Sequence, residues 1–199
     1  MFYEVAKNDH GLPYDPIKAI VAPRPIGWIT SISARGEINL APYSFFNAFS
    51  TRPPIVGFSS EGMKDSVAFV EETGEFVCNL ATYDLREAMN ATSASVPRGV
   101  DEMKLAGLEA APSRLVKPPR VAAAPCALEC RWLRTVALTD LDGRDMDRHL
   151  VLGVVVAVHI EDRFIKNGMV DTAAMRPIAR CGYNDYAVID SLFAMKRPK

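Results

Sequence analysis

The chain has 199 residues, a formal net charge of −1 and a hydrophobic content of 49%. These values suit one domain over residues 1–199 with a sizeable core. The sequence has no basic run interleaved with aromatic residues, which argues against a surface that binds nucleic acid or an anionic membrane. No leader pattern opens the sequence, and the apolar run from Leu150 to Ile160 is too short to cross a bilayer as a helix. We therefore expect a soluble, cytoplasmic protein.

The first part of the chain predicts an arm followed by a hairpin. Residues 1–22 are expected to form an extended arm with a short turn. From Ile26 to Ser33 bulky and mostly small residues alternate, which indicates a strand with two unlike faces. A turn at 34–37 is expected to reverse the chain, which then returns through residues 38–40 as the second strand of the hairpin. Pro42 is expected to end this pairing, because proline cannot donate a hydrogen bond to a strand ladder.

The next segment alternates strands with short helices. Residues 43–50 are expected to form an aromatic-rich loop or a short strand. The other expected elements are strands at 55–59 and 75–81 and helices at 64–72, 84–94 and 101–106. We expect Asp65 or Ser66 to cap the first helix, Gly74 to end it, and Asp84 to cap the second. Residues 95–120 are otherwise irregular and are the expected insertion or mobile element.

The second half of the chain predicts a long hairpin. Residues 125–139 are expected to form one strand and residues 149–160 its antiparallel partner, joined through a turn at 140–143. Both faces of the 149–160 segment are apolar, which indicates a central place in the sheet. Strands at hairpin spacing with a few short helices predict a mainly β fold, a β-barrel with helical decorations.

The group Lys64-Asp65-Ser66 has the features of a phosphate site. At a helix start, the positive end of the helix dipole and backbone N–H groups meet a hydroxyl and an ammonium group. Ser59, at the end of the preceding strand, offers a further hydroxyl. The alternative is a plain capped helix with a solvated lysine, since capping is the commoner role of such residues.

Other polar side chains of this stretch suit a flavin ring. Such a ring needs small residues above it and hydrogen bonds along its polar edge. Thr30 and Ser31 on the first strand, and the loop Asn47-Ala48-Phe49-Ser50, offer both. Taken alone, Thr30 and Ser31 fit equally well as ordinary hydroxyl residues of a strand, and the loop 47–50 fits equally well as an ordinary turn.

The four cysteines, Cys78, Cys126, Cys130 and Cys181, include no CxxC pair. Reduced thiols and no metal site are therefore expected. Cys126 and Cys130 lie four residues apart on a predicted strand, which is too far for an undistorted disulfide.

The order of these segments resembles a known family. PRPIGWITS, NLAPYSFFNAFS, KDS and EFVCNL follow one another within residues 14–85, and HLVLGVVVAVHI and RCGYNDY extend the likeness more weakly. The series is similar to the flavin reductase-like FMN-binding proteins of the split-barrel class, which include flavoredoxin and the flavin reductase components of two-component monooxygenases.

This resemblance implies a six-stranded Greek-key split barrel and a homodimer with FMN near the dimer interface. The residues implied to contact the cofactor are Thr30, Ser31, Asn47, Ala48, Phe49, Ser50, Ser59, Lys64, Asp65 and Ser66. His149 falls where the nicotinamide-using reductases carry a histidine near the flavin. Alternatively, this histidine only caps its strand.

The function implied is that of an FMN-binding oxidoreductase that takes electrons from NAD(P)H. The acceptor would be free flavin, a partner monooxygenase or another small molecule. A non-catalytic flavin carrier and a split barrel that has lost its flavin remain as alternatives.

Overall fold

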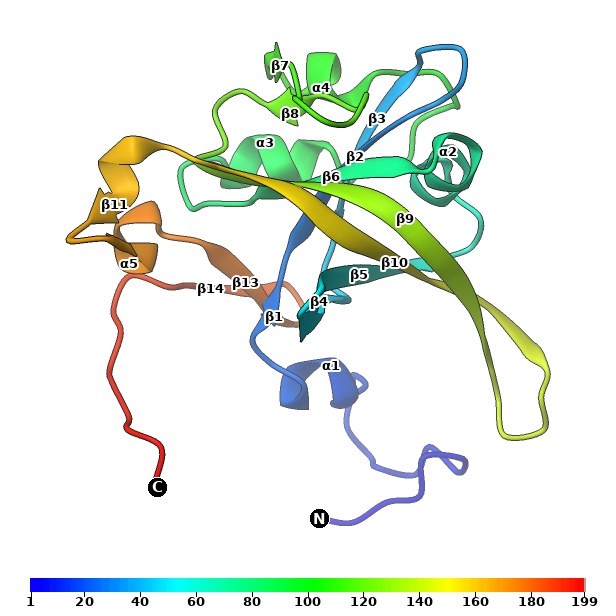
Figure 1. Ribbon diagram of the computed structural model, residues 1–199. Helices are drawn as coiled ribbons and strands as arrows, with labels where there is room; N and C mark the ends of the chain where they lie inside the picture. The colour runs from blue at the N-terminus through cyan, green and yellow to red at the C-terminus, as the bar shows by residue number, and fades with distance from the viewer. Residues whose placement is uncertain (199) are drawn as a thin grey trace.

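A computed structural model describes residues 1–198 and confirms the mainly β fold. Seven antiparallel strands form the main sheet in the order β3-β2-β6-β9-β10-β5-β4, and Figure 1 shows how they curve across the molecule. These strands are β2 (Gly27–Ile32), β3 (Ile38–Tyr43), β4 (Phe46–Thr51), β5 (Pro54–Glu61), β6 (Glu75–Leu80), β9 (Cys126–Thr139) and β10 (Asp145–Ile160). The sheet has seven strands where the resemblance implies six.

Smaller elements surround this sheet. The short strands are β1 (Arg24–Pro25), β7 (Ala110–Ala111), β8 (Arg120–Val121), β11 (Ile165–Lys166), β12 (Met169–Val170), β13 (Ile178–Gly182) and β14 (Asp185–Val188). The helices are α1 (Ile17–Ile20), α2 (Asp65–Thr73), α3 (Arg86–Ala91), α4 (Glu102–Leu105), α5 (Thr172–Met175) and the 3₁₀ turn η1 (Asp162–Phe164). Among the helices of residues 1–198, none has both the length and the apolar character needed to cross a membrane.

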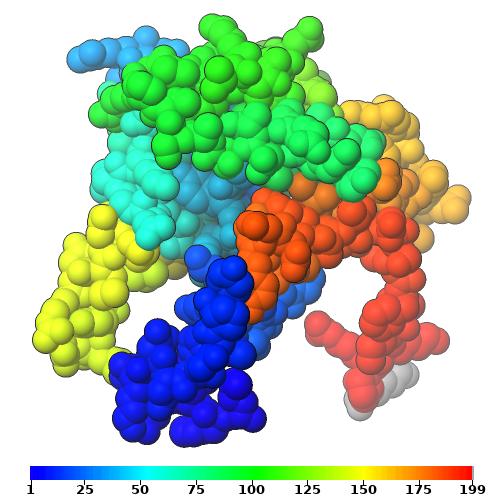
Figure 2. All heavy atoms as spheres, turned by 180° about the vertical axis from the view of Figure 1, so that it is seen from behind, coloured from blue at the N-terminus to red at the C-terminus, as the bar shows by residue number. Residues whose placement is uncertain are grey.

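The hairpin of β9 and β10 is the longest feature of the fold. β10 lies between β9 and β5, which confirms its predicted central place. Three irregularities in its register with β9 accompany its curvature. Figure 1 and the opposite view in Figure 2 show the hairpin tip extending away from the body, whereas residues 95–120 cover the barrel.

Two hydrophobic clusters fill the space on either side of β2, as its alternating pattern predicts. Ile29 belongs to a cluster with Phe58 and Phe76, within the curved sheet. Trp28 points the other way and belongs to a cluster with Met89 of α3 and Met103 of α4. The small helices therefore close the outer face of the sheet.

Several predicted boundaries are wrong. β10 begins at Asp145 instead of His149, and α3 ends at Ala91 instead of Ala94. β3 continues through Pro42, which is paired with Trp28, because β3 lies at an end of the strand order and has only one neighbour to bond in the sheet. The helix predicted from Asp84 begins only at Arg86 and has no side-chain cap. Asp84 instead lies 3.5 Å from the guanidinium of Arg176.

Candidate functional site

The start of α2 leaves its backbone N–H groups without a side-chain cap. Lys64 is the N-cap residue and its backbone is extended, while Gly74 ends the helix in the left-handed conformation. The prediction that Asp65 or Ser66 caps this helix is wrong. Asp65 pairs with Arg98 at 3.2 Å, and the Ser66 hydroxyl accepts a 2.7 Å hydrogen bond from the Asn39 amide. The first N–H groups of the helix therefore remain available as donors.

A hollow of about 320 Å³ lies over this helix start, and we call it the α2 hollow. Its wall consists of the helix start, part of β3, the serine-rich segment that follows α3, and one glutamate of α4. The residues lining it are Asn39, Ala41, Pro42, Tyr43, Lys64, Asp65, Ser66, Thr92, Ser93, Ala94, Ser95, Val96, Arg98 and Glu102. The structure thus brings the three predicted phosphate-site residues together, and adds Asn39, Glu102 and the 92–98 segment, which were not predicted.

Glu102 is the buried carboxylate of the α2 hollow. It is 6% exposed, and one carboxylate oxygen accepts a 3.0 Å hydrogen bond from the backbone N–H of Leu40. Burial raises the pKa of Glu102, the neighbouring carboxylates of Asp65 and Asp101 add to the rise, and the Leu40 N–H opposes it. An anion bound beside Glu102 would raise this pKa further.

Thr30 and Ser31 are both buried on β2, but their hydroxyls differ. The Thr30 hydroxyl bonds to the Asn79 amide at 2.9 Å. The Ser31 hydroxyl has no hydrogen-bond partner within residues 1–198. Ser31 is paired across the strands with Asn39, which places both side chains on one face beside the α2 hollow. A buried hydroxyl without a partner costs free energy, so its presence here points to a ligand.

The other predicted cofactor residues lie outside the α2 hollow. Asn47, Ala48 and Phe49 are exposed along β4, and Ser50 is half-buried at its end. The Phe49 ring lies against Gly57, where an added Cβ would come within 2.9 Å of it. Ser59, on β5, is half-buried and paired with a residue of β10. β4 therefore presents an open edge with an amide, a ring and a hydroxyl.

His149 is placed on β10, opposite Ser60 of β5. Its side chain is mostly buried, and its Nε2 atom lies 3.3 Å from a carboxylate oxygen of Asp147. The space beside Gly153, four residues further along β10, is filled by Phe76, whose ring lies 2.4 Å from an added Cβ. Gly153 therefore serves the packing of the core.

All four cysteines are free thiols. Within the described residues, no group of three or more His, Cys, Asp or Glu side chains is arranged to hold a metal ion.

Comparison with known proteins links this geometry to one family. The sequence matches the flavin reductase like domain over residues 21–175. An uncharacterized protein from Aquifex aeolicus is 33% identical over 192 residues, covering 94% of both chains. Nitrilotriacetate monooxygenase component B from Bacillus cereus has a TM-score of 0.90 at 27% identity, covering 98% of both chains. A protein with a split barrel domain from Shewanella frigidimarina has a TM-score of 0.83 at 19% identity, covering 98% of this chain and 94% of its own, and confirms the fold class.

Proposed function

The chain belongs to the flavin reductase like domain family, and from this premise we propose that it is an FMN-binding oxidoreductase that uses NAD(P)H. The observation that carries the proposal is the α2 hollow. Its uncapped helix start, the Lys64 side chain and the Ser66 hydroxyl together provide the donors and the positive charge that a phosphate dianion needs.

Two parts of the chain would hold the rest of the cofactor. Ser31 and Asn39 offer a hydroxyl and an amide next to the phosphate side. The β4 residues Asn47 to Ser50 offer hydrogen bonds and small side chains to the ring edge. When bound, FMN supplies the ability to accept a hydride and to release electrons singly or in pairs. The protein positions it and leaves a face open to the nicotinamide.

One structural neighbour supports a proposal for the electron acceptor. The B. cereus neighbour is a component of a monooxygenase, which supports a partner monooxygenase or free flavin as the electron acceptor of this chain. His149 is proposed to contact the nicotinamide or the reduced flavin. A non-catalytic FMN carrier is the second candidate, favoured by the mostly buried His149 side chain and its contact with Asp147.

We also propose a homodimer with FMN near its interface. The β9–β10 hairpin exposes apolar side chains along its length, namely Trp132, Leu133, Val136, Leu138, Leu141 and Met146. A second copy of the chain would remove this surface from water. Light scattering should give twice the 21.9 kDa chain mass, and a monomer that binds FMN tightly would contradict a shared site.

The visible spectrum of the purified protein tests this function. We expect a flavin spectrum after FMN is added, and anaerobic bleaching on addition of NADH or NADPH. If the protein binds FMN but neither nicotinamide bleaches it, only the carrier function remains. If the protein does not bind FMN, both proposed functions are wrong.

A further inference from the structure

A second hollow, of about 490 Å³, lies at the C-terminal end of β10. We call it the Arg114 hollow. Its charged and polar side chains are Arg114, Arg120, His159 and Glu161, and its apolar wall includes Leu115 and Val158. No residue lines both this hollow and the α2 hollow. Its volume lies within the range of small-molecule sites, about 300–1,000 Å³.

A buried carboxylate fixes the shape of this hollow. Glu129 is fully buried and accepts hydrogen bonds from the backbone N–H groups of Arg114 at 2.8 Å and Leu115 at 2.6 Å. The same carboxylate bonds to Nε2 of His159. Burial by itself would raise the pKa of Glu129, but the hydrogen bonds from His159 and the two N–H groups hold it below its usual value. The carboxylate thus anchors both the loop and the imidazole.

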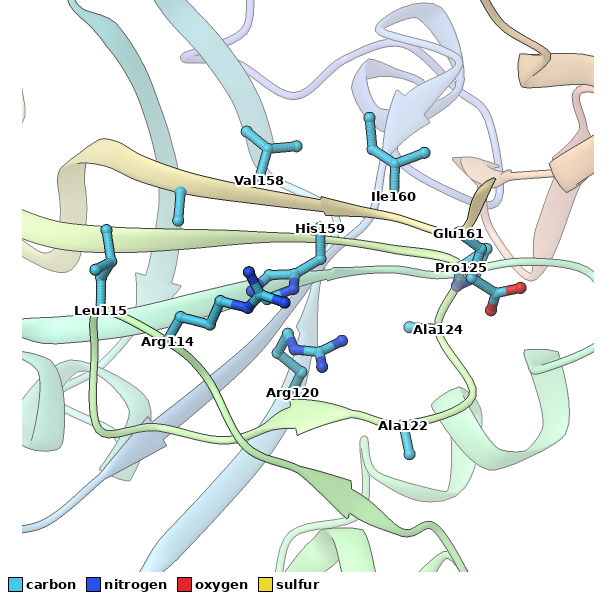
Figure 3. Close-up of a pocket in the computed structure, with 11 residues that line it drawn as sticks. Arg114, Leu115, Arg120, Ala122, Ala124, Pro125, Val158, His159, Ile160 and Glu161 are labelled. Atoms are coloured by element: carbon cyan, nitrogen blue, oxygen red, sulfur yellow. The ribbon is translucent and has the colours of Figure 1, made fainter. Parts of the chain in front are cut away.

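The guanidinium groups of the hollow have no acidic partner. Glu129 is bonded to His159 and Glu161 to Arg163, and in the part of the chain that the structure describes no carboxylate pairs with Arg114 or Arg120. Figure 3 shows both arginine side chains extending into the same space as His159. The hollow therefore holds two guanidinium groups that form no ion pair within residues 1–198, and its one lining carboxylate, Glu161, is paired with Arg163. Together with the partly apolar wall, this combination suits an organic oxyanion.

We propose that the Arg114 hollow binds a small organic oxyanion, a phosphate or a carboxylate, at a site separate from the flavin. Arg114 and Arg120 bind the oxygens, and the organic part lies against Leu115 and Val158. His159 is a positioning residue, because its Nε2 is bonded to the Glu129 carboxylate, which fixes the ring on the wall of the hollow. Glu129 acts only through the loop and the imidazole that it anchors.

Calorimetric titration of the FMN-saturated protein at low salt tests this site. The probes are phenyl phosphate and benzoate, with benzyl alcohol as the uncharged analogue. We expect saturable 1:1 binding of at least one anion and none of the alcohol. Arg114→Gln and Arg120→Gln should each weaken binding about ten- to a hundredfold, the loss of one charge-assisted hydrogen bond. FMN affinity should not change.

Lys117→Gln is the matched control, since it removes one positive charge from the same loop but lies outside the hollow. Binding of phenyl phosphate alone assigns a phosphate ligand, and binding of benzoate alone a carboxylate. The proposal is overturned if neither anion saturates, if Lys117→Gln weakens binding as much as the arginine variants, or if the arginine variants lose FMN.

Discussion

The α2 hollow and the Arg114 hollow are each built beside one buried glutamate, but the two carboxylates differ in how fully they are bonded. Glu129 accepts from three backbone N–H groups and from His159, and its pKa is lowered. Glu102 accepts from two backbone N–H groups, those of Leu40 and of Glu102 itself, and its pKa is raised. A fully bonded charge serves as an anchor, whereas a sparsely bonded charge with an unpartnered hydroxyl nearby fits a site that a ligand completes.

Loss of the anchor should give the largest effect. Glu129→Ala leaves three backbone N–H groups and His159 without their acceptor, and should lower the free energy of unfolding by about 3–5 kcal/mol. Denaturant unfolding measures the change. FMN affinity, measured where the variant is still folded, should stay unchanged. A loss below 1 kcal/mol would show that Glu129 is no anchor, and a matching loss of FMN would show that the two hollows are coupled.

His149→Ala tests whether this residue of β10 contributes to the reduction of the flavin. If His149 assists hydride transfer, the variant should keep its fold and flavin spectrum but be reduced by NAD(P)H roughly ten to a thousand times more slowly. Anaerobic stopped-flow reduction measures the rate, and a melting curve serves as the control. A lower melting temperature with an unchanged rate would make His149 structural.

Lys64→Ala tests the phosphate role of the α2 hollow. FMN binding should weaken by about 1.5–3 kcal/mol, the value of one charge-assisted hydrogen bond. Riboflavin, which lacks the phosphate, should bind the variant and the parent equally, so fluorescence titration with both ligands provides the control. Equal losses for the two ligands would assign Lys64 a structural role.

Ser31→Ala and Thr30→Val compare an unpartnered hydroxyl with a bonded one. Without FMN, Ser31→Ala should leave stability unchanged or raise it by up to about 1 kcal/mol, because it removes an unsatisfied buried group. Thr30→Val should lower stability by about 1 kcal/mol, because Asn79 loses its bond. With FMN present, Ser31→Ala should bind the cofactor more weakly. If both variants lose the same stability, the Ser31 hydroxyl must have a hydrogen-bond partner in the folded protein.

The smallest effect is a difference in pH dependence. The raised pKa of Glu102 gives stability that is present below its ordinary value of 4.5 and is lost as pH rises through the folded-state pKa. Glu102→Gln should therefore gain stability relative to the parent as pH rises above about 4.5. The lowered pKa of Glu129 acts in the opposite sense, since its contribution is lost as pH falls. Melting curves from pH 4 to about pH 8 should show this trend for Glu102→Gln, and a flat difference would contradict it.

The sequence predicts the fold class and the core of the α2 hollow well. The strand alternation at 26–33 corresponds to β2, and the apolar segment 149–160 corresponds to β10 without its first four residues. Gly74 ends α2 as expected. Lys64 and Ser66 are close in sequence, so one helix start is enough to bring them together, and the predicted family is confirmed.

The rest could not be predicted because it depends on contacts between distant residues. The Asn39–Ser66 bond joins residues 27 apart, and the Leu40–Glu102 bond joins residues 62 apart. The predicted caps fail for the same reason, since Ser66 bonds to Asn39 instead of to its own helix. The Arg114 hollow carries no local motif, because its anchor, loop and histidine meet only in the folded chain.

A crystal structure of the protein with FMN would show whether the α2 hollow holds the cofactor. We expect the phosphate in the α2 hollow, with its oxygens at about 2.7–3.2 Å from the Lys64 ammonium and from backbone N–H groups at the start of α2. The ring should extend toward β4. A phosphate bound elsewhere, for instance against Arg114 and Arg120, with the α2 hollow filled only by water, would overturn the proposed site.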